Sequence, residues 1–286
     1  MLYANLSNFL SKGLPDLPPG PIAVLLMEDY SETNSTIRHH MRLGFANILL
    51  CGPDTLTISK ELTGKIHHIR CDPTADGALT AILNPIIAAT TGRWLYYGFN
   101  AEYLFYPFCE TRNIVEVTGF ATEERRDSIL TYVIDLYADD LSAHSNGVSL
   151  KDAHLDKSGY YAHSRSRDEQ VMERQLDMFG GLRWRFEEHV PPERRKIDRI
   201  GLFRAQKGLK LRADHTFSIE EYNTYACPWH HNLTAAICSF RAAKSLKTNP
   251  GSSPEIDSFT WHNSQKFDWR SQQLLELGLM EPGQWF

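Results

Sequence analysis

The sequence lacks the features of membrane, secreted and metal-ribbon proteins. No segment reaches the roughly 18 uninterrupted apolar residues that a membrane-spanning helix needs. The first residues lack the basic start, apolar run and cleavage site of a signal peptide, which predicts a cytoplasmic protein and leaves open a peripheral position at the inner face of the membrane. The five cysteines are scattered without a C-x-x-C pair, so neither a disulfide framework nor a zinc ribbon is expected.

Several nucleotide-binding and catalytic motifs are missing as well. No G-x-G-x-x-G follows the first predicted strand and no G-x-x-x-x-G-K-[ST] occurs, which disfavours a Rossmann dehydrogenase and a P-loop NTPase. The G-x-S-x-G elbow of α/β-hydrolases is absent too. The net charge of -5 gives no general field for nucleic acid, which is therefore not expected as a partner. Any anion would have to be held by a local cluster of cations.

The chain is nevertheless large and apolar enough for a full core, with 286 residues of which 42% are hydrophobic. Residues 1–21 predict a short packing helix and a proline-rich lead-in. Strands are then predicted at 22–27, 45–51, 66–71 and 93–99, with helices at about 33–44 and 79–92. This alternation predicts an α/β domain over residues 22–250 with a mainly parallel sheet flanked by helices.

The pattern weakens beyond Ala101. Strands are predicted at 111–121, 180–186 and 198–205, a helix is predicted at 230–247, and the signals over 124–141 are mixed. The polar stretch 142–175 predicts a long loop or mobile insertion, because it has few branched apolar residues to bury. Residues 251–286 form an aromatic tail that is expected to pack back onto the domain.

Acidic or amide residues follow the ends of the four early strands. They are Glu28 and Asp29, then Asp54, then Asp72, then Asn100. In an open parallel sheet, ligands bind beyond the carboxyl ends of the strands. Any one of these residues alone is more often a helix cap or a turn residue. Their occurrence on one rim is what indicates a binding site.

These segments resemble family-2-like glycosyltransferases of the GT-A fold. EDYSETNSTIRHHMRLGFANILLCGPD is similar to the opening of such enzymes, and TGRWLYYGFNAEYLF resembles the segment that carries their Asp-x-Asp-Glu-Phe-Leu motif. RIGLFRAQKGLKLRADHTF resembles their strand, loop and histidine segment, and HHNLTAAICSFRAAKSL the His-led helix that follows. The resemblance spans most of residues 22–247. It implies a GT-A-like fold, a nucleotide-sugar donor, and a glycan or glycolipid acceptor in polysaccharide biosynthesis.

The resemblance also implies which residues bind the donor. A late histidine can lie beside the donor phosphates, and guanidinium groups suit diphosphate oxygens. His230 and His231 open the predicted late helix, where two adjacent side chains cannot both face one ligand. The residues predicted to bind the nucleotide-sugar are Glu28, Asp29, Asp54, Asp72, Asn100, Arg199, Arg204 and His215.

An inverting transfer needs a carboxylate that deprotonates the acceptor hydroxyl. Asp127 and Asp135 lie downstream of the metal-motif position, where the acceptor side should begin, and Asp127 is predicted to be the base. Asp127 could equally be the N-cap of the segment that follows it.

The metal motif departs from that of the family. If Glu102 begins the Glu-Phe-Leu part, Phe99 and Ala101 stand where the aspartates should be. If Asn100-Ala101-Glu102 is the Asp-x-Asp, one ligand is an amide and Glu102 is the only carboxylate. Mg²⁺ and Mn²⁺ prefer anionic oxygens, so both alignments predict weak binding of either metal at Glu102. A structural role, with the carboxylate satisfied by backbone amides, is the equal alternative.

The sequence therefore predicts an inverting glycosyltransferase with a weakened metal motif. The alternative is a non-catalytic GT-A relative that binds nucleotide or acts as a scaffold, which the altered motif favours. A nucleotidyltransferase is disfavoured because EDYSET lacks the Gly-rich, Lys-containing loop of those enzymes.

The two alignments of the metal motif can be separated by one substitution. Any transfer activity should depend only weakly on Mn²⁺, because at most one anionic ligand is present. Asn100→Asp should raise the affinity for Mn²⁺, measured by calorimetry, if Asn100-Ala101-Glu102 is the Asp-x-Asp, and should leave it unchanged in the other alignment. Strict Mn²⁺ dependence of the unaltered protein, lost in Glu102→Ala, would contradict the weak-metal prediction.

Overall fold

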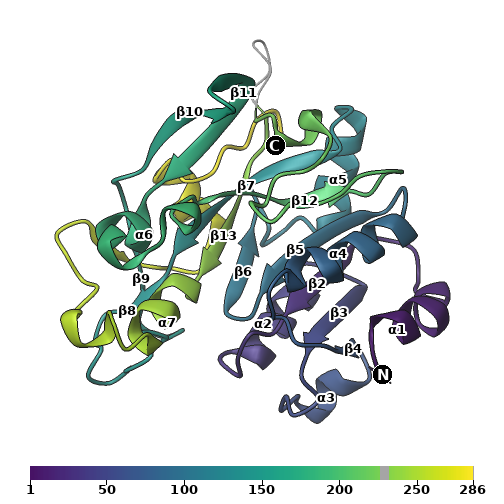
Figure 1. Ribbon diagram of the computed structural model, residues 1–286, viewed down its shortest axis with the longest axis horizontal. Coiled ribbons are helices and arrows are strands. Elements are labelled where there is room, and N and C mark those ends of the chain that lie inside the picture. The colour runs from purple at the N-terminus through teal and green to yellow at the C-terminus, as the bar shows by residue number, and fades with distance from the viewer. Residues whose placement is uncertain (226–231, 286) are drawn as a thin grey trace. The chain divides into compact units, whose positions relative to one another are not determined.

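The computed structural model describes residues 1–225 and 232–285 and has an α/β architecture whose large mixed sheet is mainly parallel (Figure 1). The chain forms two compact units, each made of separate stretches of sequence. Unit 1 comprises residues 1–101, 109–130 and 200–223, and unit 2 comprises residues 102–108, 131–199 and 224–286. Within the described ranges, no helix is long and apolar enough to cross a bilayer. The predicted domain limits, 22–250, stay a prediction.

Unit 1 is built on strands that are hydrogen-bonded in the order β1-β4-β3-β2-β5-β12. The first five of these strands are mutually parallel, and β12 pairs antiparallel with β5 through Leu202 and Tyr96. The bounds are β1 Leu2–Tyr3, β2 Ile22–Leu26, β3 Asn47–Gly52, β4 His67–Arg70, β5 Trp94–Phe99 and β12 Asp198–Arg204. The predicted strands at 22–27, 45–51, 66–71, 93–99 and 198–205 are confirmed.

Helices cover both faces of the sheet in unit 1. Side chains of β5 alternate, so Leu95, Tyr97 and Phe99 share one buried cluster with α1 and α4, whereas Tyr96 stacks on His40 of α2. The predicted helices at 33–44 and 79–92 are confirmed. The helices of this unit are α1 Leu6–Lys12, α2 Thr33–Arg42, α3 Lys60–Thr63, α4 Ala78–Ala89 and α5 Ile114–Glu123, with 3₁₀ turns η1 Leu14–Asp16 and η4 Glu220–Asn223.

The strand predicted at 111–121 is wrong, because α5 occupies this segment. Asn113 accepts hydrogen bonds from the backbone N–H groups of Val115 and Glu116, and the Glu116 carboxylate accepts one from the Asn113 backbone N–H. This reciprocal capping box begins the helix despite the β-branched residues that follow. The spacing Asn-x-x-Glu was the signal in the sequence that the strand prediction overlooked.

Unit 2 has three sets of paired strands. β13 Ala235–Ser239 pairs in parallel with β7 Ser128–Asp135 and antiparallel with β6 Glu102–Phe105. β10 and β11 form a hairpin, and β9 pairs with β8 and β14. The remaining bounds are β8 Tyr137–Ala138, β9 Ala153–Asp156, β10 Tyr161–Arg167, β11 Gln170–Phe179, β14 Ser264–Lys266, α6 Gly181–Arg185, α7 Arg241–Thr248 and α8 Ser271–Glu276, with 3₁₀ turns η2 Glu187–His189, η3 Pro192–Arg194 and η5 Ser253–Glu255.

The loop predicted at 142–175 is wrong in its secondary structure, because β9, β10 and part of β11 lie within it. The β10–β11 turn is Asp168-Glu169, and both residues have positive φ, 50° and 63°. Tight hairpin turns of this kind usually carry Asn-Gly or Asp-Gly, so Asp168-Glu169 is not recognisable as a hairpin turn from the sequence. The strands are mostly exposed, which explains their polar composition.

Two further predictions are wrong. Residues 180–186, predicted as a strand, contain α6. The helix predicted at 230–247 is instead β13 followed by α7, and His230 and His231 lie outside the described residues. The short apolar run of β13 is buried between two neighbouring strands, and periodicity alone cannot tell such a run from a buried helix. In the aromatic tail, Phe267 and Trp269 pack against Phe105 and Tyr103 of β6.

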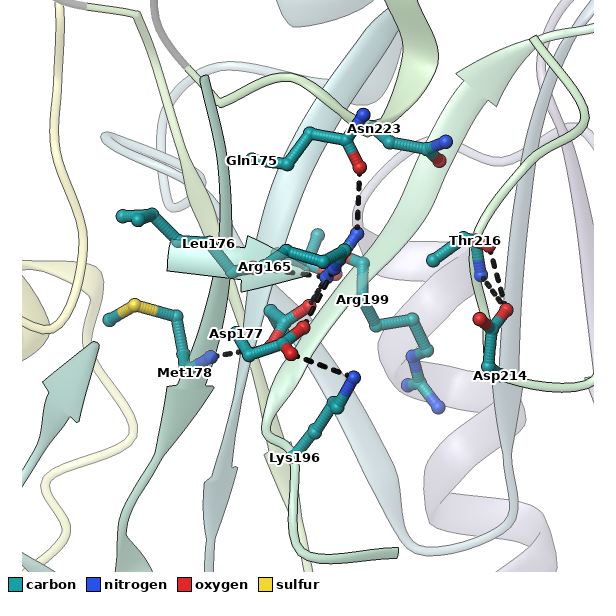
Figure 2. Close-up of polar contacts among 12 residues, drawn as sticks. Arg165, Gln175, Leu176, Asp177, Met178, Lys196, Arg199, Asp214, Thr216 and Asn223 are labelled. Carbon is teal, nitrogen blue, oxygen red and sulfur yellow. Dashed lines mark hydrogen bonds and ion pairs between the residues drawn. The ribbon is translucent and has the colours of Figure 1, made fainter. Parts of the chain in front are cut away.

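A buried ionic cluster joins the β10–β11 hairpin to the start of β12 in unit 2 (Figure 2). The Arg165 guanidinium donates to Asp177 at 2.7 Å and to Asp198, and its side chain is only 9% exposed. Lys196 pairs with the second oxygen of Asp177 at 2.9 Å, and the backbone N–H of Met178 donates to Asp198 at 2.6 Å. The positive charges of Arg165 and Lys196 balance the negative charges of Asp177 and Asp198, so the cluster has no net charge.

Removing Arg165 should destabilise the protein strongly. Arg165→Met keeps most of the side-chain volume but leaves Asp177 and Asp198 short of a buried counter-charge, at a cost of roughly 3–5 kcal/mol in the free energy of unfolding. Urea denaturation measures this loss. The control is Arg38→Met, which breaks the exposed pair with Glu61 and should cost about 1 kcal/mol or less. Equal losses in the two variants would contradict a special role for the buried cluster.

Candidate functional site

Strand order places a topological switch point between β2 and β5 in unit 1. From β2 the chain moves outward to β3 and then β4, and it returns to the other side of β2 as β5. The connections that follow β2 and β5 therefore leave in different directions. In open α/β sheets, ligands bind at this switch point, beyond the carboxyl ends of the strands.

Asn100, which follows β5, ties the two strand ends together at this point. Its amide N–H groups donate to Asp29 Oδ1 at 2.6 Å and to the Ser31 carbonyl at 3.0 Å. Its amide oxygen accepts from the backbone N–H of Glu28 at 3.0 Å, and the side chain is fully buried. The structure thus brings together Glu28, Asp29 and Asn100, three of the residues predicted from the sequence.

The loop after β2 is further ordered by short-range bonds. Asp29 Oδ1 also accepts from the backbone N–H of Ser31 at 2.7 Å, and α2 begins two residues later at Thr33. The backbone N–H of Ala101 donates to Thr36 of α2 at 2.9 Å. Ala101 has a positive φ of 58°, a conformation that its neighbours' hydrogen bonds must hold in place. The carboxylate of Asp29 is therefore fixed in position beside the start of a helix.

Asp54 and Asp72 lie at the ends of the two outer strands and have simpler partners. Asp54 forms an exposed ion pair with Arg70 at 3.2 Å. Asp72 accepts from the backbone and hydroxyl of Thr74 at 2.9 and 2.6 Å, and these bonds lower the pKa of its carboxyl. For Asp72 the geometry is that of an ordinary turn residue.

His215 lies in the same unit, against β5. Its ring stacks on Tyr97 with an interplanar angle of 5°, and its Nδ1 lies 2.9 Å from the Tyr97 hydroxyl oxygen. Tyr97 is two residues before the end of β5, so His215 belongs to the half of the strand that leads to Asn100.

Asp127 and Arg204 lie at the other end of β5. They form an exposed ion pair at 3.6 Å, and the Arg204 backbone N–H donates to the Asp127 carbonyl. Arg204 pairs in register with Trp94, the first residue of β5, whereas Asn100 follows the last. A six-residue strand is about 20 Å long. The structure therefore does not bring Asp127 or Arg204 to the Asp29–Asn100 site, and the predicted base role of Asp127 stays a prediction.

Glu102 and Arg199 form a buried pair in unit 2. Arg199 Nη2 donates to Glu102 Oε2 at 2.6 Å, and the Ser239 hydroxyl donates to Glu102 Oε1 at 3.0 Å. Glu102 is fully buried and Arg199 is 4% exposed. Both oxygens of the predicted metal ligand thus carry donors, which agrees with the structural role that the sequence left open, although by side chains rather than backbone amides.

The residues at the predicted metal motif do not fit a divalent cation as they are placed. A cation prefers anionic oxygens free of other donors, whereas the Glu102 oxygens accept from Arg199 and Ser239 and the Asn100 oxygen accepts from Glu28. In the part of the chain that the structure describes, no three His, Cys, Asp or Glu side chains are grouped to hold a metal.

Asp135 is a buried acid at the end of β7. Burial raises the pKa of its carboxyl to about 6, against the opposing effect of Arg183, whose Nε lies 3.3 Å from Oδ1. Gly181, at φ 63°, lies over the carboxyl, and a Cβ there would stand 2.9 Å from Oδ2. Only glycine allows the backbone at position 181 to come this close to the Asp135 carboxyl.

Asp156 is the centre of a second buried network in unit 2. Its Oδ1 accepts from the Tyr137 hydroxyl at 2.6 Å, the Trp261 indole N–H at 2.7 Å and the Arg185 guanidinium at 3.1 Å. Arg185 also lies 4.6 Å from the centre of the Trp261 ring. Sequence reasoning missed this network, because its members lie far apart along the chain and no motif joins them.

No protein-family model matches this chain, and no curated protein matches its sequence.

The raised pKa of Asp135 predicts a pH dependence of stability. Between about pH 4 and pH 6 the folded carboxyl keeps its proton while the unfolded one loses it, so the free energy of unfolding falls as pH rises, by about 3 kcal/mol in total. Asp135→Asn cannot titrate and should show a smaller fall in urea denaturation across this range. Asp16→Asn, at an exposed acid, is the control and should follow the unaltered protein. Parallel curves for all three proteins would contradict the assignment.

Proposed function

We propose that this chain is a glycosyltransferase that moves a sugar, with inversion, from a nucleotide-sugar donor to a polysaccharide or glycolipid precursor. The observation that carries the proposal is the hydrogen-bonded pair Asp29–Asn100 at the switch point between β2 and β5. A fixed carboxylate there can accept hydrogen bonds from ribose hydroxyls or base N–H groups. Together with the similarity of the sequence to family-2-like enzymes of the GT-A fold, this supports a nucleoside-diphosphate site.

Asp127, the base predicted from the sequence, lies at the opposite end of β5 from the Asp29–Asn100 site. The proposal at this site therefore concerns binding of the nucleotide donor.

The partners of Glu102 favour a second candidate function. In this one, the chain is a non-catalytic relative of GT-A enzymes that still binds the nucleotide. Arg199 and Ser239 bind the carboxylate that would otherwise hold the donor's metal ion. A protein of this kind would bind a nucleoside diphosphate without turning over its sugar conjugate. Hydrolysis or transfer assays with nucleotide-sugars distinguish it from the enzyme.

Nucleotide binding tests the site that both candidates share. Calorimetric titration with UDP and GDP, with and without Mn²⁺, should show binding of at least one of them. Asp29→Ala should weaken that binding at least tenfold, because it removes the carboxylate that Asn100 holds at the switch point. Asp29→Asn, which keeps the shape of the side chain, separates loss of charge from loss of loop order.

The matched control is Asp16→Ala, an exposed acid outside the Asp29–Asn100 site, which should bind as the unaltered protein does. Thermal unfolding establishes that each variant is folded. The nucleotide site is wrong if neither nucleotide binds, or if folded Asp29→Ala and Asp54→Ala both keep full affinity.

A further inference from the structure

Unit 2 carries a row of contacting aromatic rings that reaches the surface. We define the aromatic strip as Phe179, Tyr161, Trp184 and Trp261. The three distances between successive centroids of these four rings are 5.3, 6.4 and 6.5 Å. Tyr161 is 40% exposed and Trp184 is 38% exposed. The rings come from β11, β10, α6 and the segment before β14, so folding rather than local sequence assembles them.

Buried polar contacts fix the Trp261 end of the strip. The Trp261 indole N–H donates to buried Asp156, and the Arg185 guanidinium lies over the Trp261 ring while it pairs with the same carboxylate. A Cβ at Gly159, where φ is 95°, would stand 3.4 Å from the Trp184 ring and 3.9 Å from the Trp261 ring. A site whose rings are already fixed loses less conformational entropy when a ligand binds.

Histidines flank both ends of the strip. The exposed ring of His163 contacts Tyr161 at 5.3 Å, and the exposed ring of His262 contacts Trp261 at 4.6 Å. The exposed surface thus combines flat apolar ring faces with polar edges that donate and accept hydrogen bonds. Single exposed apolar residues need no explanation, but contiguous exposed rings with a polar rim indicate an interaction site.

The size of the strip decides between kinds of partner. Large aromatic side chains bury about 150–250 Å² each, so Tyr161 and Trp184 together leave on the order of 150–200 Å² exposed. A stable protein interface takes about 800 Å² from each partner. The exposed rings alone therefore fall well short of a protein interface, and a small ligand suits their size better.

We propose that the aromatic strip binds a glycan chain built of neutral hexopyranoses. Such sugars present a face of C–H groups that packs on an aromatic ring, and hydroxyl groups at their edges that suit the flanking imidazoles. The description of this glycan as the acceptor rests on the proposed glycosyltransferase function. Binding of the glycan itself does not depend on that function, because the strip lies wholly in unit 2.

Binding of oligosaccharides to the full chain tests the proposal. The probes are maltohexaose and cellohexaose, which are neutral α- and β-linked chains, and saturation-transfer NMR together with tryptophan fluorescence measures their affinity. At least one probe should bind and perturb the Trp184 indole signal. Trp184→Ala and Tyr161→Ala should each weaken binding at least tenfold, and both sites are exposed enough for the variants to fold. Val171→Ala, at a 70% exposed position on the same hairpin, should stay within twofold.

Three results would overturn the proposal. They are failure of both probes to bind the folded protein, unchanged affinity in Trp184→Ala and Tyr161→Ala, and a dimer in light scattering that either variant converts to a monomer. UDP titration of the same samples separates the two proposals. Glycan binding without UDP binding would remove only the donor site, and UDP binding without glycan binding would remove only the strip.

Discussion

The side chain of Asn100 is the contact on which the candidate donor site depends. A short polar residue here uses both amide hydrogens and its oxygen to join the turn after β5 to the loop after β2. An apolar residue could not make these hydrogen bonds. It would leave the buried backbone groups of the two segments without the partners that they need. An aspartate would place a second carboxylate against Asp29. The neutral amide at this position thus has a structural reason, whatever its relation to a metal motif.

Unit 2 relies on buried arginines to a degree that unit 1 does not. Arg165, Arg185 and Arg199 each pair with a buried carboxylate, at Asp198, Asp156 and Glu102 respectively. Such pairs add little net stability compared with an apolar core, but breaking one of them leaves a costly isolated charge. Each of the three pairs joins segments that lie far apart in the sequence.

The sequence predicted most of unit 1, with the exception of α5, and predicted unit 2 poorly. Strands β2, β3 and β5 are mostly apolar runs followed by polar residues, and this pattern is enough to find them and to place Asp29 and Asn100 on one rim. The hairpin β10–β11 has polar strands and a turn without glycine, and β13 is too short for its periodicity to be read. Asp127 was assigned to the acceptor side only by analogy with the family. Its actual position, just before β7, depends on the strand order, which one sequence does not reveal.

The way the chain alternates between the two units limits how the protein could be shortened. It passes from one unit to the other between residues 101 and 102, 108 and 109, 130 and 131, 199 and 200, and 223 and 224. No contiguous stretch of the gene therefore encodes either unit alone. For the same reason a nonsense mutation anywhere before codon 200 removes strands from both units and yields no functional half.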